Sequence, residues 1–420
     1  MRKLKIGLLG CGTVGGGLVE LVSRNSALIR QRAGVDLSIT KILVRDSKRQ
    51  RPGVERELLT DDPEKVINNG CDLVVELVGG IEPARSFIQR ALAGGKHVVT
   101  ANKALLALDG FNLMKAAEDQ KVRLGFEGSV CGGIPIIRVL RSGLVGNRIH
   151  KLSGILNGTC NYILTRMSED RLDFDVALAQ AQTKGFAEAD PALDIDGHDA
   201  AQKLKILSEL AFHTRISADG IQLEGIRDIT ADDVVAAQEL GYVIKHVATA
   251  EVENGTISLR VEPLLLPSEH QLAGIRDENN AVLVRGDAVG EMLFSGKGAG
   301  SLPSASAVLS DVVDIASHKA EFVARSGEVV PAGSSDYRSK HYLRFTVNDP
   351  SAIGPITTIL ERNGVGIASA AAVWAKTASG RNQVRVLTHE CPHKVVQKSL
   401  VDVRHLSLEK RKSLSLRLAA

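Results

Sequence analysis

The chain has 420 residues, which is enough for two or three domains with separate hydrophobic cores. Its formal net charge of +3 is too small to favour nucleic acid or an anionic membrane as a partner, and no apolar run is long enough to span a membrane. The cysteines are scattered without paired spacing, which favours a reducing, cytoplasmic setting over a disulfide framework: Cys11, Cys71, Cys131, Cys160 and Cys391.

The first predicted element is a buried strand over residues 3–9, which leads into a glycine-rich turn and a helical pattern from Leu18. Such glycines allow a tight turn, close approach of a pyrophosphate and close helix packing, while the helix N-terminus favours the phosphate charge. We therefore predict a dinucleotide-binding turn formed by Gly10, Gly12, Thr13, Val14 and Gly15.

The second predicted strand, residues 36–44, bears on which nucleotide binds. Asp36 lies about 20 residues past the glycines, the usual distance for a ribose-binding acid. However, Asp36 opens the strand, whereas the ribose is contacted at the strand's C-terminal end. Arg45 stands there, and its planar guanidinium suits a 2′-phosphate. We expect NADP; Asp46 leaves NAD possible, and a basic surface loop is the alternative reading.

Two more strands are predicted over residues 72–78 and 96–100. Both are almost wholly apolar, as expected for parallel strands covered on both faces. Ligands bind at the C-terminal ends of such strands. Thr100 and Lys103 are therefore candidates for contact with the cofactor or substrate, against the default of an ordinary surface lysine.

An acidic run then brings five carboxylates into twelve positions: Glu188, Asp190, Asp194, Asp196 and Asp199. They repel one another unless a cation, a proton donor or a cationic substrate lies among them. A helix beginning near Gly197 would place Asp199 and Lys203 on one face, where a lysine beside a carboxylate can act as a general acid or base. A solvated acidic loop is the plain alternative. A calcium loop fails on spacing, because Lys203 would replace its closing glutamate.

The rest of the chain predicts a second sheet and a C-terminal module. Helical spacing continues to about residue 213. A strand pattern follows over 243–267 with a turn at 253–255, which predicts a hairpin, and strand-like sequence continues over 279–303. A helix is expected over 304–316. Residues 325–340 have the composition of a linker. Beyond them, the order is strand, helix, strand, strand, helix, strand.

Several stretches together resemble homoserine dehydrogenases over about residues 1–320. They are GCGTVGGG at 10–17, ELVGG at 76–80, TANK at 100–103, ILNGTCNYIL at 155–164, the block 181–203 and GKGAGSLPSASAVLSD at 296–311. The resemblance implies NAD(P)H-dependent reduction of L-aspartate 4-semialdehyde to L-homoserine, in the biosynthesis of threonine, methionine and isoleucine. It also implies an α/β protein with a Rossmann-type domain over 1–137, to which 304–320 returns, and an α+β catalytic and dimerisation domain with an open sheet over 138–303.

The resemblance also implies roles for particular residues. Lys203 would be the proton donor and acceptor, Lys103 would assist at the substrate oxygen, and Asp194 would orient the lysine or a water. Carboxylates suit the substrate's ammonium group, and a lysine suits the alkoxide formed by hydride transfer. The remaining implied contacts are Glu188, Asp199, Gly158 and Thr159 for the substrate, and Gly185 and Gly300 for the cofactor.

The resemblance further implies a structural monovalent cation, usually sodium. Its expected ligands are Glu127, Val130, Gly132 and Ile134, a set dominated by backbone carbonyls, which suits a cation that prefers oxygen.

Three other functions are compatible with parts of the sequence. Cys131 could be a thioester-forming nucleophile, as in aspartate-semialdehyde dehydrogenase, but no histidine lies within a few residues. Another NAD(P)-dependent oxidoreductase with a similar tail, such as a hydroxyacid dehydrogenase, would need a catalytic histidine, and only His198 stands near the acidic run. A nucleotide-sensing regulator would need a DNA-binding helix pair or a basic arm, and neither is evident.

Residues 341–420 resemble a ferredoxin-like ACT domain, a small-ligand regulatory module. Its first turn, 349–354, has Ala352 where a glycine is usual, which narrows the space for an effector. Regulation by threonine and a role in assembly alone both stay open. We expect a homodimer or homotetramer, and the single-function form of the enzyme, because no kinase-like segment precedes residue 1.

Overall fold

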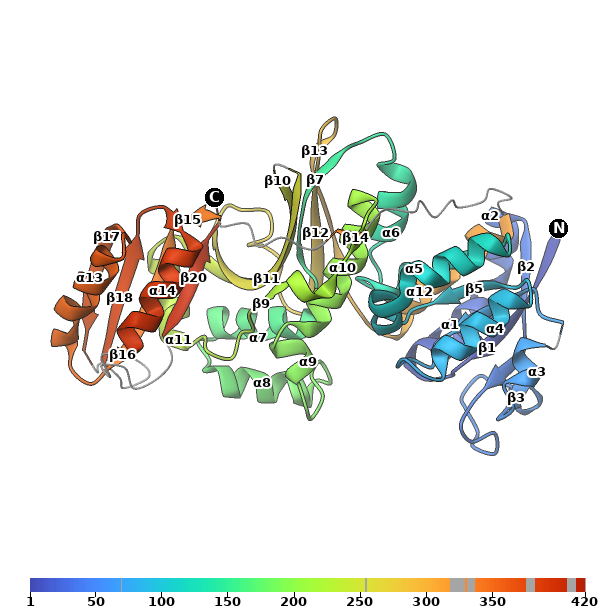
Figure 1. Ribbon diagram of the computed structural model, residues 1–420. Coiled ribbons are helices and arrows are strands. Elements are labelled where there is room, and N and C mark those ends of the chain that lie inside the picture. Colours follow the sequence, from blue (N-terminus) through green and yellow to red (C-terminus); the bar gives the residue numbers. More distant parts are fainter. Residues whose placement is uncertain are drawn as a thin grey trace. The chain divides into compact units, whose positions relative to one another are not determined.

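The computed structural model describes residues 1–68, 70–253, 255–317, 329–330, 337–374, 382–405 and 413–419 (Figure 1). The contacts divide the chain into two compact units, each assembled from three segments. The first contains Met1–His150, Gln202–Ala218 and Asn280–Pro331, and the second contains Lys151–Ala201, Asp219–Asn279 and Ala332–Ala420. The predicted linker, 325–340, lies largely outside the described residues. Among the helices that the structure describes, none is both long and apolar enough to cross a membrane.

The first unit is built on a parallel sheet with the strand order β3-β2-β1-β4-β5-β6. Its strands are β1 (Arg2–Leu9), β2 (Val35–Leu43), β3 (Leu59–Thr60), β4 (Leu73–Glu76), β5 (His97–Thr100) and β6 (Leu124–Gly125). The chain reverses direction across the sheet between β1 and β4, and ligands of such sheets bind outside the strand C-termini at this point. The predicted α/β fold with a Rossmann-like sheet is confirmed.

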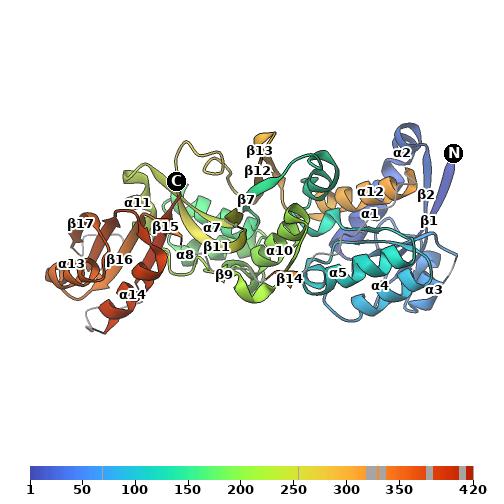
Figure 2. The ribbon, with the colours of Figure 1, turned by 45° about the horizontal axis from the view of Figure 1, so that its top comes forward.

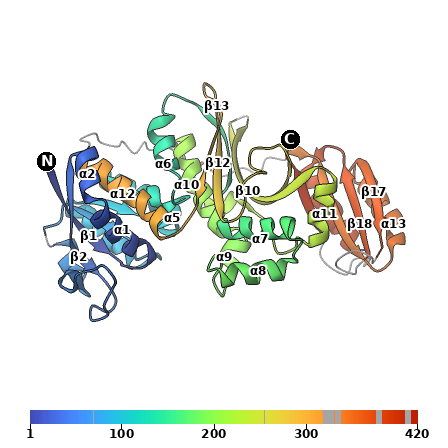
Figure 3. The same ribbon diagram turned by 180° about the vertical axis from the view of Figure 1, so that it is seen from behind.

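Helices cover both faces of this sheet, with α1 packed against α12 and α4 against α5 (Figures 1 and 3). Leu4, Leu18 and Val308 belong to one core, so α12 packs with the strand and helix that open the chain. The helices of this unit are α1 (Thr13–Arg24), α2 (Ser26–Ala33), α3 (Glu64–Ile67), α4 (Ala84–Ala93), α5 (Lys103–Asp119), α6 (Ile136–Arg138) and α12 (Ser301–Ser317). The strands β8 (Arg215–Ile216), β12 (Asn279–Gly286), β13 (Gly290–Lys297) and β14 (Val329–Val330) complete it.

The second unit has a mixed sheet with the strand order β7-β10-β11-β20-β16-β18-β17, and β9 lies beside β11. The long predicted hairpin is present as the antiparallel pair β10 and β11. The elements before the C-terminal module are β7 (Ile149–Ile155), α7 (Gly158–Glu169), α8 (Phe174–Thr183), α9 (Ala192–Ile195), α10 (His198–Phe212), β9 (Gln222–Leu223), α11 (Ala231–Glu239), β10 (Tyr242–Glu253) and β11 (Thr256–Pro267). Helix α10 begins in this unit and continues into the first.

The C-terminal part of the second unit has the βαββαβ order expected from the sequence, with its elements labelled in Figure 1 and β16, α13, β17 and α14 seen from another direction in Figure 2. Its elements are β16 (His341–Val347), α13 (Ile353–Arg362), β17 (Ile367–Val373), β18 (Asn382–Thr388), α14 (His393–Arg404) and β20 (Leu414–Leu418), with β15 (Arg338–Ser339) paired to β19 (Cys391–Pro392). Because successive strand residues point to opposite faces, Leu343 and Phe345 pack in a core with α13 and α14, while Tyr342 and Arg344 bond Asp233 of α11. Strand β20 also pairs with β11, so one sheet runs through both parts of the unit.

Candidate active site

The glycine turn between β1 and α1 has the geometry that a pyrophosphate needs. Gly10 has a φ of +97°, and a Cβ atom there would lie 2.7 Å from the carbonyl oxygen of Leu77. A Cβ atom on Gly15 would lie 2.3 Å from the carbonyl oxygen of Gly10, whereas one on Gly12 would meet nothing within 4 Å. The turn is therefore tight at its two ends and open at Gly12. Thr13 and Val14 open α1 without an acidic residue, so the helix N-terminus is suited to an anion.

Gly15→Ala is expected to weaken NADPH binding, because the added methyl group collides with backbone that cannot move without opening the turn. Overpacking costs about 1–3 kcal/mol, which corresponds to roughly 5–100-fold in affinity. Fluorescence titration with NADPH measures the effect. The matched control is Gly16→Ala, because a Cβ atom there meets nothing within 4 Å. Equal affinities of the two variants would contradict the prediction.

The end of β2 presents Arg45 to solvent, two residues after the strand ends, while Val44 is buried. Asp46 accepts a hydrogen bond from the backbone N–H of Lys48 at 2.9 Å, so this carboxylate shapes its own turn. Asp36 pairs with Lys3 in the sheet register, near the N-terminal ends of both strands, and it forms an ion pair with Arg30 at 3.2 Å. The structure thus places Arg45, and not Asp36, at the strand end where a ribose is read.

A buried carboxylate, Glu76, organises the ends of β4 and β5. One of its oxygens accepts a hydrogen bond from the Thr100 hydroxyl at 2.6 Å. The other accepts from the backbone N–H groups of Val78 and Gly79 at 2.7 and 3.0 Å. Because Glu76 and Thr100 are both fully buried, this network sets the course of the chain where it leaves both strands.

Asn102 continues that network and positions Lys103. Its side-chain oxygen accepts a hydrogen bond from the backbone N–H of Leu105 at 3.1 Å and caps α5, and its amide donates to the carbonyl oxygen of Gly80 at 2.6 Å. The backbone N–H of Asn102 donates to the Thr100 hydroxyl at 3.1 Å. Lys103 is the first residue of the helix capped in this way, so its backbone is held at the sheet's C-terminal edge.

In the second unit, the acidic run separates into carboxylates with different partners. Asn157 donates from its side-chain amide to Asp194 at 2.7 Å and to Asp199 at 2.8 Å. Its side-chain oxygen accepts from the backbone N–H of Cys160 at 2.8 Å and caps α7. The Thr159 hydroxyl lies 2.6 Å from the carbonyl oxygen of Phe186 and 3.3 Å from Asp194. Two carboxylates therefore converge on the N-terminus of α7, the end of a helix that favours negative charge.

The other acids of the run have separate roles. Asp196 forms an ion pair with Arg227, and this hydrogen bond lowers the pKa of the Asp196 carboxyl. Asp190 accepts from the backbone N–H of Ala192 at 3.1 Å. Glu188 is exposed, and its backbone carbonyl accepts from Gln182 at 3.1 Å. The five carboxylates are therefore not a single cluster.

Helix α10 carries Asp199 and Lys203 four residues apart, and both are buried, with 4% and 8% of their surface exposed. The predicted helix start near Gly197 is confirmed, since α10 begins at His198. This spacing puts the carboxylate and the ammonium on neighbouring turns of one helix face.

The predicted site residues divide between the two units. Those in the first are Gly10, Gly12, Thr13, Val14, Gly15, Arg45, Thr100, Lys103, Lys203, Gly300 and the four expected cation ligands, and those in the second are Gly158, Thr159, Gly185, Glu188, Asp194 and Asp199. Gly300 directly precedes α12, and the Ser301 hydroxyl donates to the carbonyl oxygen of Thr13 at 2.8 Å, beside the glycine turn. Gly185 follows α8 in the second unit.

The expected cation segment begins with Glu127, which is 2% exposed. Its carboxylate accepts hydrogen bonds from the backbone N–H groups of Ile137 and Arg138, both at 2.8 Å. Burial, and then the nearby Asp311, raise the pKa of Glu127 to about 7. The carbonyl oxygen of Ile134 accepts from the N–H of Ile136 at 2.8 Å. A carbonyl oxygen that accepts one hydrogen bond keeps a second lone pair, so the Ile134 carbonyl could also coordinate a hard cation.

Cys131 lies within the same segment and is fully buried. The side-chain amide of Asn280 lies 3.6 Å from its sulfur. A thiol enclosed in this way suits a packing role better than that of a nucleophile, which has to reach a substrate.

Three residues that the sequence reasoning did not assign to the site have structural roles there: Glu76, Asn102 and Asn157. Asn102 and Asn157 each stand directly before a helix, where an asparagine is a strong N-cap signal. Glu76 had no comparable signal, because its importance depends on Thr100, 24 positions away.

The sheet order, the open glycine turn and the buried residues at the strand ends define an NAD(P)-dependent oxidoreductase with a separate unit that carries paired carboxylates. A family model described as "Homoserine dehydrogenase, NAD binding domain" matches residues 10–127, and one described as "Homoserine dehydrogenase" matches residues 135–313. The chain belongs to the homoserine dehydrogenase family. Its activity is the NAD(P)-dependent interconversion of L-aspartate 4-semialdehyde and L-homoserine.

Similar proteins cover nearly the whole chain. Homoserine dehydrogenase of Bacillus subtilis is 37% identical over 398 residues, covering 93% of this chain and 92% of the relative. The crystal structure of a homoserine dehydrogenase from Thiobacillus denitrificans is 39% identical, with a TM-score of 0.89 over 100% of this chain and 99% of that one. A hyperthermophilic archaeal homoserine dehydrogenase mutant in complex with NADPH is 28% identical, with a TM-score of 0.63 over 75% of this chain and 98% of that one.

Proposed function

We propose that the carboxylates held by Asn157 bind the ammonium group of the amino-acid substrate and that Lys203 transfers the proton. The single observation that carries this proposal is the convergence of Asp194 and Asp199 on one amide at the N-terminus of α7. A pair of carboxylates held side by side suits a cationic group such as an ammonium. Lys203 follows Asp199 by one turn of α10, so the ammonium site and the proton donor share a helix.

Each further residue has a role that its chemistry supports. Hydride delivery to the aldehyde carbon gives an alkoxide, which Lys203 protonates and Lys103 stabilises. Asp194, besides its part in the ammonium site, orients the lysine or a water, and Glu188 and Asp199 bind the substrate, with Gly158 and Thr159 at the opening of α7. The nicotinamide supplies the hydride when bound, and the glycine turn, Thr100, Gly185 and Gly300 hold the dinucleotide.

The activity is tested by following NADPH oxidation with L-aspartate 4-semialdehyde and NADP⁺ reduction with L-homoserine. We expect turnover in both directions and none with a 2-hydroxy acid such as malate. Turnover of the hydroxy acid instead of homoserine would overturn the substrate assignment.

We propose NADP as the preferred cofactor, because the exposed guanidinium of Arg45 stands at the end of β2. Arg45→Ala is expected to raise the KM for NADPH by about tenfold and to leave the KM for NADH within about twofold, since only NADPH carries the 2′-phosphate. The exposed Arg24→Ala, whose partner Glu20 is on the same helix, is the control. Equal changes of both KM values would contradict the assignment.

We propose that a monovalent cation, most simply Na⁺, is held by Glu127, Val130, Gly132 and Ile134. Because both carboxylate oxygens of Glu127 already accept backbone N–H groups, the carbonyl oxygens of the segment supply most of the coordination. The ion would stabilise the turn before α6 and would take no part in the chemistry.

We propose four domain assignments and an assembly. Residues 1–137 with 304–320 form the nucleotide domain, 138–303 form the catalytic and dimerisation domain, 325–340 form a linker, and 341–420 form an ACT module in a cytoplasmic homodimer or homotetramer. Ala352 is buried before α13, so its methyl group occupies space that a glycine would leave to an effector. The module therefore serves assembly, and threonine inhibition is the alternative that an assay with added threonine decides.

A further inference from the structure

A buried lysine lies on β10, outside the acidic run. Lys245 is 3% exposed, and burial lowers the pKa of its amine to about 8. The amine donates to the side-chain oxygen of Asn161 at 3.0 Å and to the backbone carbonyl of Ile275. Burying an ammonium group is costly unless it is well bonded, so this arrangement needs an explanation.

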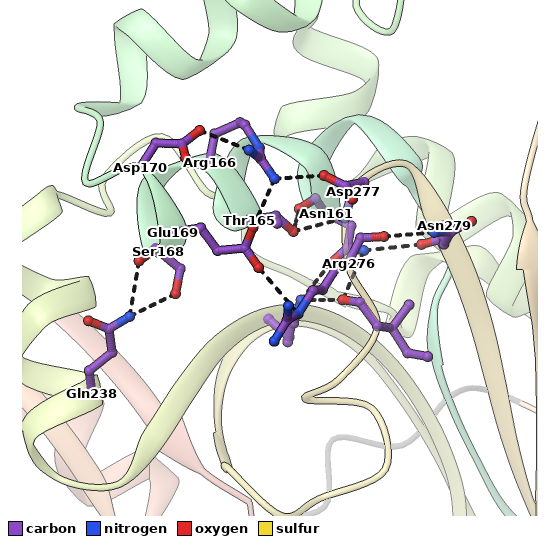
Figure 4. Close-up of polar contacts among 12 residues, drawn as sticks. Asn161, Thr165, Arg166, Ser168, Glu169, Asp170, Gln238, Arg276, Asp277 and Asn279 are labelled. Carbon is purple, nitrogen blue, oxygen red and sulfur yellow. Dashed lines mark hydrogen bonds and ion pairs between the residues drawn. The ribbon is translucent and has the colours of Figure 1, made fainter.

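Lys245 and Asn161 together hold the turn formed by residues 275–279 on helix α7. The amide of Asn161 donates to the carbonyl oxygen of Ile275 at 3.2 Å and to that of Asn279 at 3.1 Å, so one side chain spans both ends of the turn. The backbone N–H of Asp277 donates to the Thr165 hydroxyl at 3.1 Å. Figure 4 shows Asn161 and Thr165 on the helix beside the turn.

Two ion pairs also join the 275–279 turn to α7, at residues that follow Thr165 along the helix. Arg166 forms an ion pair with Asp277 at 2.8 Å, and Arg276 forms one with Glu169 at 3.2 Å (Figure 4). Asp277 has a φ of 55°, in the left-handed region that aspartate tolerates better than most non-glycine residues. The turn is therefore fixed to α7 at Arg276 and Asp277.

The turn also lies against the opening of α7. A Cβ atom on Gly158 would lie 2.6 Å from the carbonyl oxygen of Glu278, so helix and turn are in close backbone contact there. Gly158 directly follows Asn157, which binds Asp194 and Asp199. Any displacement of the turn thus reaches the residue that holds the paired carboxylates.

We propose that Lys245 is a positioning residue for the amino-acid substrate, which it serves by fixing the 275–279 turn through Asn161 and thereby placing the N-terminus of α7. This role rests on the proposed function, in which the carboxylates at that helix end bind the ammonium group. Lys245 does not contact the substrate in this account. Its contribution is geometric, and binding sites are sensitive to shifts of about 1 Å.

The test compares Lys245→Met with Lys151→Met. Lys151 lies on the neighbouring strand β7 and forms its ion pair with Glu251 at 3.4 Å, away from the turn, so the control removes a lysine from the same sheet. We expect Lys245→Met to raise the KM for homoserine by about tenfold or more and to leave the KM for NADP⁺ within about twofold. Lys151→Met leaves both values within about twofold.

A second variant covers the case in which Lys245→Met does not fold. Thr165→Val keeps the shape of the side chain and removes the acceptor for the N–H of Asp277, so the KM for homoserine rises while the melting temperature stays close to that of the wild type. An unchanged homoserine KM in a folded Lys245→Met, or in Thr165→Val if the first does not fold, overturns the role of Lys245. Absence of homoserine turnover in the wild type would instead overturn the proposed function on which it rests.

Discussion

Lys203→Met is expected to lower kcat for homoserine oxidation by about 10²–10⁴-fold, the usual contribution of a positioned proton donor. Oxidation of an alcohol by a nicotinamide releases a proton from the hydroxyl, and methionine cannot accept it. Lys203 is 8% exposed and lies one turn from Asp199. Because methionine has nearly the volume of lysine, the variant removes the charge and leaves the packing nearly unchanged. Stopped-flow or steady-state NADP⁺ reduction measures the loss, and circular dichroism verifies the fold.

Lys205→Met provides the control on the same helix. Its amine forms an ion pair with Glu209 at 2.6 Å, so the same substitution two residues further along removes a different contact. We expect kcat within about threefold of the wild-type value, since Lys205 has no proposed role in the chemistry and its ion pair lies within the helix. Retention of most activity by Lys203→Met would rule out Lys203 as the proton-transfer residue.

The largest expected effect on stability comes from Arg344→Met, which breaks a buried ion pair between β16 and α11. The guanidinium lies 2.9 Å from Asp233, and the two side chains are 4% and 0% exposed. Arg344 also donates to the carbonyl oxygen of Asp228 at 2.7 Å, and the Tyr342 hydroxyl donates to Asp233 at 3.1 Å. Removing one partner leaves a buried charge, at a cost of about 3–5 kcal/mol.

Urea unfolding followed by far-ultraviolet circular dichroism measures this change in the free energy of unfolding. The control is Arg338→Met, whose ion pair with Glu390 at 3.6 Å is more than half exposed on both sides, and which is expected to cost less than about 1 kcal/mol. The double variant Arg344→Met with Asp233→Asn should recover part of the loss, because the charge is removed while an oxygen acceptor remains for Tyr342 and Thr230. Equal unfolding midpoints for the two single arginine variants would contradict the account.

Features that depend on neighbouring residues were predictable from the sequence. The glycine turn, the apolar parallel strands, the β10–β11 hairpin and the start of α10 each have a local pattern of glycine or hydrophobic spacing. The βαββαβ order of the last 80 or so residues was predictable for the same reason.

Contacts between distant positions were not predictable in this way. The acidic run reads as one cluster in the sequence, but Asp196 pairs with Arg227, 31 positions away, and Asp199 bonds Asn157, 42 positions away. The bond between Lys245 and Asn161 spans 84 positions. The pairing of β20 with β11, which joins the C-terminal module to the central sheet, has no signal in either strand alone. Charge and spacing indicate which residue types are available, and only the fold selects the partners.

The proposed binding of the substrate's ammonium group by Asp194 and Asp199 can be measured with a substrate that lacks that group. The relevant quantity is the ratio of kcat/KM for L-homoserine to that for 4-hydroxybutanoate, which lacks only the amino group. We predict a ratio of about 10–10² for the wild type, since a charge-assisted contact contributes about 1.5–3 kcal/mol, and a ratio that falls towards 1 in Asp199→Asn. A ratio that Asp199→Asn leaves unchanged would contradict it.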